Sequence, residues 1–146
     1  MDDFVDRSIK KEFVRRQECF SKLTEDEIEK LAELFSEVHF KQGETIVTEG
    51  ALVDSVFLIM KGIAEVRQFV IKENKPESVS VAKLEAGEAI GLNEKGFYSL
   101  SGKRTASVIA MTDVIALRLN VAEFHGFALA HSHVSQVMRQ NAESLK

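Results

Sequence analysis

The chain has 146 residues, a formal net charge of −4 and one cysteine, Cys19. This length favours a single domain that covers residues 1–146. A lone thiol excludes an internal disulfide or a thiolate metal cluster. No apolar run approaches ~18 residues, so we expect no membrane partner. The acidic start lacks a secretory signal, and an acidic balance argues against nucleic-acid binding. We therefore expect a cytoplasmic single domain.

Helix signals cover residues 1–36. Val5, Ile9 and Phe13 recur at a spacing of four, which predicts one face of a helix. A second helix is marked by a capping box, in which the Thr24 side chain accepts an amide and Glu27 bonds back. The sequence therefore predicts N-terminal helices before the first strand.

The period changes over residues 37–120, where short runs rich in Val, Ile, Phe and Thr alternate with glycine or polar turns. Seven or eight strands without intervening helices predict an antiparallel sandwich or barrel rather than a doubly wound parallel sheet. Pro76 is placed in a charged hairpin tip, where its missing N–H costs no ladder bond. The predicted strands are Glu37–Phe40, Thr45–Thr48, Ser55–Met60, Ile63–Ile71, Ser78–Leu84, Thr105–Met111 and Val114–Leu119.

Residues 121–146 are predicted to be helical again. Asn120 and Glu123 have the spacing of a cap pair, and a further helix is expected from about Ser132. Its apolar residues form a short seam that a second copy of the chain could match, with too few contacts for a coiled coil. The seam consists of Val134, Met138 and Leu145, with Asn141 between them. These C-terminal helices are the candidate surface for a homodimer contact or an effector protein.

The connection over residues 89–108 is longer than the ~2–5 residues of a usual hairpin loop. It contains three glycines and ends on Lys103 and Arg104, followed by small residues as a new strand begins. Glycine lets backbone amides approach a ligand, and amides at a short helix N-terminus favour an anion. Arginine adds a planar fork that can bond two phosphate oxygens. A glycine-led turn, a short helix and Arg104 therefore predict a site for a single phosphate.

These motifs resemble the cyclic nucleotide-binding domain family. The resemblance covers roughly residues 24–140 and includes spaced glycines and an Arg-Thr-Ala-Ser-Val run. The family folds as an antiparallel jelly-roll, a double-stranded β-helix or β-roll that is mainly β with flanking helices, in agreement with the strand pattern. The runs that carry the resemblance are Phe40–Gly50, Asp54–Val66, Leu84–Gly91 and Arg104–Ala110.

The resemblance implies a phosphate-binding cassette between Gly91 and Ala106, with cAMP or cGMP as the ligand and no other cofactor. Arg104 stands at the family's phosphate-binding arginine. Thr105 and Ala106 would present amides, and the Thr105 hydroxyl, to the cyclic phosphate or the base. The implied ligand-binding residues are Gly91, Leu92, Asn93, Glu94, Arg104, Thr105 and Ala106, with Val66, Val81 and Ala82 against the ribose and base.

Leu92 departs from the family pattern, which carries a glutamate there for the ribose 2′-hydroxyl. Losing a charged hydrogen bond costs ~1.5–3 kcal/mol, roughly ten- to a hundred-fold in affinity. Glu94 could accept the hydrogen bond from the ribose hydroxyl instead if the loop is shifted in register. Two functions therefore stay open. The first is a non-enzymatic regulatory module that binds cAMP or cGMP and relays it through the C-terminal helices. The second is a degenerate domain that binds no nucleotide and serves as a protein-interaction scaffold.

Other chemistry has weaker support. His125, His131 and His133 could indicate a cupin-like metal site, but such sites need His-x-His on a strand, so a solvated helix face is the favoured interpretation. Cys19 is expected to be a packing residue, because nothing beside it assembles a Cys–His nucleophile. No serine lies in a nucleophile elbow. We therefore expect a binding module rather than an enzyme.

Overall fold

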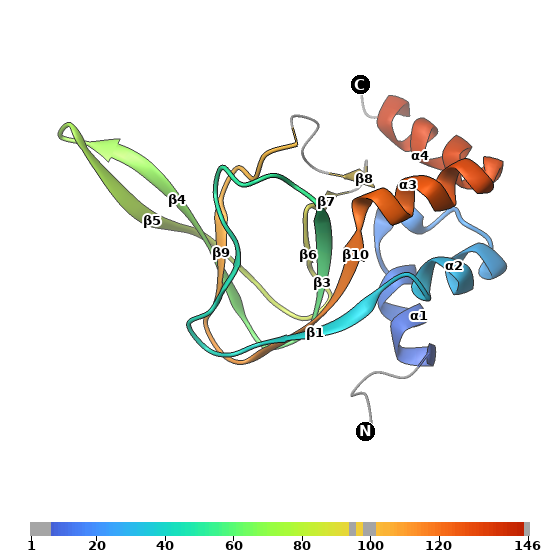
Figure 1. Ribbon diagram of the computed structural model, residues 1–146, viewed down its shortest axis with the longest axis horizontal. Coiled ribbons are helices and arrows are strands. Elements are labelled where there is room, and N and C mark those ends of the chain that lie inside the picture. Colours follow the sequence, from blue (N-terminus) through green and yellow to red (C-terminus); the bar gives the residue numbers. More distant parts are fainter. Residues whose placement is uncertain (1–6, 94–95, 98–101, 145–146) are drawn as a thin grey trace.

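Two four-stranded antiparallel sheets form a β-roll, with helices from both ends of the chain at one side of it (Figure 1). The computed structural model describes residues 7–93, 96–97 and 102–144. The first sheet has the order β1 (Ser36–Phe40), β10 (Val114–Asn120), β3 (Ser55–Lys61) and β6 (Ala89–Ile90). The second has the order β2 (Thr45–Val47), β9 (Ser107–Ala110), β4 (Ala64–Lys72) and β5 (Lys75–Leu84). A separate pair joins β7 (Leu92–Asn93) and β8 (Gly96–Phe97).

The helices begin where local chemistry predicts. Thr24 Oγ1 accepts a hydrogen bond from the Glu27 amide at 3.2 Å, and Glu27 Oε1 accepts one from the Thr24 amide at 2.8 Å. Asn120 Oδ1 accepts from the Glu123 amide at 3.1 Å. Both predicted caps are confirmed. The helical segments are α1 (Arg7–Arg15), the 3₁₀ helix η1 (Glu18–Phe20), α2 (Glu25–Ala32), α3 (Val121–Ala130) and α4 (Ser132–Ser144).

Strand β3 divides the interior into two cores. Its side chains from Ser55 to Met60 are all buried, because one face meets the second sheet and the other meets the helices. The inner core, between the sheets, consists of Val47, Phe57, Ile59, Ala64, Ile90, Val108, Ala110, Val114 and Ala116. The outer core, beneath the helices, includes Phe20, Leu31, Phe35, Val56, Leu58, Leu92, Leu117, Leu119, Phe124, Val134 and Val137.

Strands β4 and β5 pair into a long ribbon that projects from the roll (Figure 1). The turn at its tip is Glu73–Asn74, with φ of 50° and 66°, the positive values of a two-residue type I′ hairpin. Pro76 therefore lies inside β5, paired with Ile71, and not in the hairpin tip as the sequence predicted. Since β5 is an edge strand, it tolerates a residue without an N–H.

Two predictions for the helices differ from the structure. In α1 the fully buried residue is Val14, and of the predicted face Phe13 packs partly buried against the outer core while Ile9 is exposed. Val5 lies outside the described residues. In α4, Val134 is buried in the chain's own outer core, and Asn141 Nδ2 donates to the Cys19 carbonyl oxygen at 2.8 Å. These two members of the expected seam are therefore occupied within one molecule.

None of the helices in the described ranges has both the length and the apolar character needed to cross a membrane.

Candidate functional site

A cavity of about 360 Å³ lies between the β4–β5 ribbon and the segment that runs through β6 and β7. Its volume is within the range of small-molecule sites, and most of its lining is apolar. The polar side chains in the described lining are Gln68, Asn93, Arg104 and Thr105. The predicted site residues that line the cavity are Gly91, Leu92, Asn93, Arg104, Thr105, Ala106, Val66 and Val81.

Two predicted site residues are not among that lining. Ala82 pairs with Val66 but does not line the cavity, because the register shifts beyond this pair and leaves Val81 unpaired as a bulge. A bulge redirects a side chain, and here Val81 takes the lining position. Glu94 lies outside the described residues.

Arg104 is the charged residue in the described part of the cavity lining, and the residue is only 9% exposed. Its backbone is anchored, since the Arg104 amide donates to the Ala51 carbonyl and the Gly50 amide donates to the Arg104 carbonyl, both at 2.8 Å. Its Nη2 donates to the Ser55 carbonyl oxygen at 2.5 Å. The guanidinium is thereby held at the cavity rather than in solvent.

The charge of Arg104 is only partly compensated. Burial lowers the pKa of Arg104, and the charge of Asp54 opposes this from a distance. Within the described ranges, no carboxylate oxygen lies within 4.0 Å of the guanidinium. A buried charge without an ionic partner is unfavourable, and an arginine stays protonated. The site is therefore suited to an anion that enters the cavity.

Because Gly91 has no side chain, its backbone can lie close to Val56 and Arg104 at this end of the cavity. Its φ is +90°, and a Cβ there would lie 2.9 Å from Val56 Cγ1 and 3.3 Å from Arg104 Nη1. Any side chain would push against both the sheet and the guanidinium. The sequence pattern singled out this position, and the backbone conformation and the two close neighbours explain why it is a glycine.

Leu92 lies on the border between the cavity and the outer core. Its side chain is buried and belongs to both linings. Nearby, β8 approaches α4 so closely that a Cβ on Gly96 would lie 2.9 Å from Met138 Cε. The turn after β6 therefore contacts the ligand cavity on one side and the C-terminal helix on the other.

Gln68 is a cavity residue that the sequence analysis missed. Its Nε2 donates to the Thr105 carbonyl oxygen at 3.0 Å, which ties β4 to the segment after Arg104. The signal was present, because Gln68 follows Val66 by two residues and alternate residues of a strand share a face. The other lining residues that were not predicted are Val47, Val53, Leu84, Ala89, Ile90 and Val108.

The histidines and the cysteine are placed away from this cavity. His133 Nδ1 lies 2.8 Å from Glu27 Oε1, and His131 Nδ1 lies 2.9 Å from the Phe127 carbonyl oxygen. Among the described residues, no group of three or more His, Cys, Asp or Glu side chains is arranged to hold a metal ion. Cys19 is buried, and burial raises its pKa to about 12, as expected of a packing residue.

Comparison with known proteins decides the family. The family model of the cyclic nucleotide-binding domain matches residues 37–131, which span the roll and α3. The chain belongs to this family. The predicted fold class, an antiparallel β-roll with flanking helices, is confirmed.

A cGMP-dependent protein kinase of Drosophila melanogaster, isozyme 2 forms cD5/T2, is 31% identical over 98 residues. The match covers 67% of this chain and 10% of that protein, so the chain spans about a tenth of its relative's length.

Two solved structures illustrate the breadth of this fold. The regulatory domain of Toxoplasma gondii PKA, crystallised with cAMP, has a TM-score of 0.69 and 22% identity, covering 94% of this chain and 50% of that one. The regulatory subunit of a cAMP-independent protein kinase A from Trypanosoma brucei has a TM-score of 0.68 and 22% identity, covering 95% and 50%. The first of these structures contains cAMP, whereas the second belongs to a kinase described as cAMP-independent, so the same fold occurs with different ligand behaviour.

Proposed function

We propose that this domain binds a cyclic nucleotide, cAMP or cGMP, with the cyclic phosphate on Arg104, and that binding is relayed to the C-terminal helices. The observation that carries the proposal is the buried Arg104 guanidinium, which faces the cavity without a carboxylate in ion-pair range among the described residues. A cyclic phosphate carries one negative charge. It would compensate the guanidinium through charge-assisted hydrogen bonds.

The remaining lining supports a nucleoside beside that phosphate. Val66 and Val81 supply an apolar wall from the ribbon, and Gln68 and Thr105 supply polar groups near it. A flat base could pack on the valines while its edge meets an amide or a hydroxyl. The combination of one cation, apolar walls and a few polar groups is typical of sites for small organic anions.

The relay is supported by the position of Leu92. A ligand that draws the Gly91 turn toward Arg104 would also move Leu92, whose side chain packs in the outer core. It would move β8 as well, which contacts α4 at Met138. A ligand shifts such an equilibrium only as far as its affinities for the two arrangements differ.

The scaffold function is the second candidate, and Leu92 is the observation that favours it. A buried leucine cannot accept a hydrogen bond from a ribose hydroxyl. Within the described residues, the cavity lining contains no carboxylate that could do so instead. On this interpretation the roll is kept as a surface for another protein.

Thermal unfolding with and without nucleotide separates the two candidates. Ligand at a hundred times its dissociation constant stabilises the folded protein by ~2.7 kcal/mol, a rise of several degrees in Tm for a chain of this size.

Arg104→Met should abolish the rise while changing the ligand-free stability by only ~1 kcal/mol, since it removes one hydrogen bond and one uncompensated charge. Arg139→Met, on the exposed side of α4, is the matched control and should keep the rise. No rise in the wild type with millimolar cAMP or cGMP would support the scaffold.

A further inference from the structure

Helix α4 is tied to the N-terminal helices by polar contacts that lie outside the cavity. His133, in the first turn of α4, has its Nδ1 2.8 Å from Glu27 Oε1 and 3.0 Å from Glu27 Oε2. Asn141, in the last turns, donates to the Cys19 carbonyl oxygen of η1. The Asn141 contact does not titrate, whereas the His133 contact joins two titratable groups that are 106 residues apart.

Glu27 is held rigidly and remains charged. It is buried in the first turn of α2, where it accepts from the Thr24 amide as part of the capping box. Burial raises the pKa of Glu27, but hydrogen bonds from Thr24 and His133 and the His133 charge outweigh this, so the pKa lies below its ordinary value. A fixed carboxylate is thus presented to an imidazole whose side chain is 47% exposed and can exchange protons with solvent.

Described titratable side chains close to Glu27 and His133 in the chain have partners of their own. On α2, Asp26 and Lys30 pair with each other at 3.1 Å on the exposed side of the helix. At the α3–α4 junction, His131 is engaged with the Phe127 carbonyl and stacks on its ring at 4.4 Å. Among the described residues, Glu27 is the carboxylate within 4.0 Å of His133.

We infer that the Glu27–His133 contact is a pH-dependent latch that sets how firmly α4 is held beside the ligand cavity. The neutral imidazole donates a hydrogen bond to the carboxylate, and protonation adds an ion pair to that bond, which makes the contact stronger. The strong form exists where the imidazole is protonated and the carboxyl is not. Histidine is the side chain whose charge ordinarily changes between about pH 5 and 8, so the strong form gains population as the pH falls through that range.

The latch has a consequence for the cavity through α4. Val134 and Val137 pack in the outer core with Leu92, and Met138 meets Gly96 of β8. A contact that holds α4 in this arrangement also holds the turn that lines the cavity beside Arg104. Since the proposed ligand moves this turn, a firmer latch opposes binding, and nucleotide binding should be weaker at pH 5.8 than at pH 7.5. This consequence rests on the function proposed above.

The latch itself is tested by urea unfolding of the ligand-free protein at pH 5.8 and 7.5. His133→Gln should raise the unfolding equilibrium constant about three-fold more at pH 5.8 than at pH 7.5, the size expected of a partly exposed ion pair. Glu27→Gln keeps a side-chain oxygen for the capping box, and should remove the same pH dependence. The double variant should show no further loss. His125→Gln, an exposed histidine of α3, is the control and should behave as the wild type.

Equal effects of His133→Gln at the two pH values, or a His125→Gln effect of the same size, would overturn the latch. Titration with cAMP and cGMP at both pH values then tests its regulatory role. A wild-type affinity loss at pH 5.8 that His133→Gln removes supports regulation, and a pH-independent affinity overturns it. If the unfolding result holds but no nucleotide binds at either pH, the latch stands and the proposed nucleotide site fails.

Discussion

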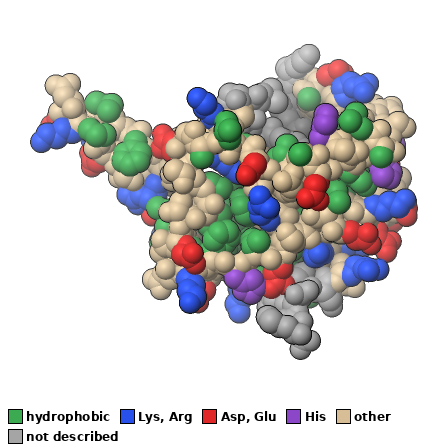
Figure 2. All heavy atoms as spheres, in the orientation of Figure 1, with side chains coloured by type: hydrophobic (Ala, Val, Ile, Leu, Met, Phe, Trp, Pro, Cys, Tyr) green, Lys and Arg blue, Asp and Glu red, His purple; other side chains and the backbone are tan. Residues whose placement is uncertain are grey.

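Strands β3 and β5 lie on opposite sides of the cavity region and differ sharply in burial. Every side chain of β3 from Ser55 to Met60 is buried, whereas most of β5 is exposed along a ribbon that extends from the roll (Figure 2). The β3 side holds the Arg104 guanidinium through the Ser55 carbonyl, and the β5 side supplies Val81. On the proposed function, the phosphate would be recognised from the folded interior, while the apolar contact with the ligand would come from a largely exposed strand.

The largest expected effect is on the buried strand. Leu58 and Ile59 are adjacent in β3 and fully buried, but Leu58 belongs to the outer core and Ile59 to the inner core. Leu58→Ala and Ile59→Ala should each destabilise the protein by about 2–5 kcal/mol, since each leaves a cavity in close-packed surroundings. Urea unfolding measures this loss.

The same pair tests whether the two cores are separable. Hydrogen exchange should reveal faster exchange in α4 for Leu58→Ala than for Ile59→Ala, because only Leu58 lies beneath the helices. Equal exchange of α4 amides in the two variants, at matched global stability, would mean that the interior behaves as one unit and that β3 does not divide it.

An intermediate effect is expected where the buried side meets the cavity. Gly91→Ala imposes a left-handed backbone on alanine, at about 1–2 kcal/mol, and places Cβ within 2.9 Å of Val56 Cγ1. It also crowds Arg104 Nη1, so the nucleotide-induced rise in Tm should be lost along with part of the ligand-free stability. Differential scanning calorimetry with and without cAMP or cGMP measures both effects.

Gly43→Ala is the matched control, because Gly43 has the same φ of +90° but a Cβ there would meet nothing within 4 Å. It should lose about 1–2 kcal/mol from backbone strain and keep the full response to nucleotide. If both alanine variants lose stability equally and both respond to nucleotide, the close approach at Gly91 has no role in the site.

How far the sequence predicts this structure depends on how local each determinant is. The Thr24 cap and the long strands follow from neighbouring residues, although β5 begins at Lys75 rather than Ser78 and the short strands β6, β7 and β8 were not predicted. Arg104 was found by a resemblance spread over most of the chain. The choice of Val81 over Ala82 depends on a bulge set by pairing with a distant strand, which no local pattern encodes.

The contact between His133 and Glu27 was missed for a similar reason. A solvated helix face was expected for His133, which is indeed half-exposed, but its partner Glu27 comes from the other end of the chain. The predicted helix face in α1 is only partly right for the same reason: Phe13 packs against the outer core, but Val14 rather than Ile9 is the fully buried residue. Contacts between distant segments are the part that single-sequence reasoning cannot supply.

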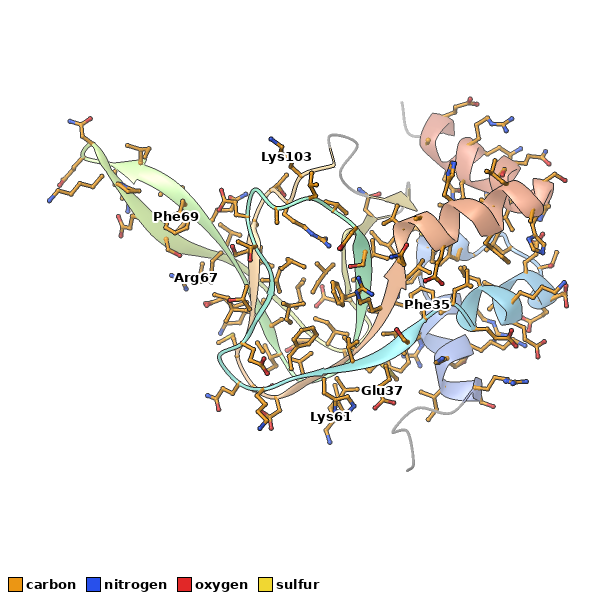
Figure 3. The ribbon with its side chains drawn as sticks, in the orientation of Figure 1. Phe35, Glu37, Lys61, Arg67, Phe69 and Lys103 are labelled. Atoms are coloured by element: carbon orange, nitrogen blue, oxygen red, sulfur yellow. The ribbon has the colours of Figure 1, made fainter. Side chains whose placement is uncertain are left out.

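The smallest effect on stability, and the sharpest test of the comparison, lies on the ribbon. Val81 is 48% exposed and lines the cavity, whereas Phe69 is 63% exposed and does not (Figure 3). Val81→Ala and Phe69→Ala should each change the free energy of unfolding by only ~0.5 kcal/mol, as at other exposed positions. Removing apolar contact at ~0.8 kcal/mol per methylene should nevertheless weaken nucleotide binding to Val81→Ala by about three- to ten-fold.

Isothermal titration calorimetry measures this loss of affinity, and Phe69→Ala is the control, whose affinity should be unchanged. Equal affinities of the two variants would mean that the exposed wall takes no part in recognition, and that the ligand is held from the β3 side alone.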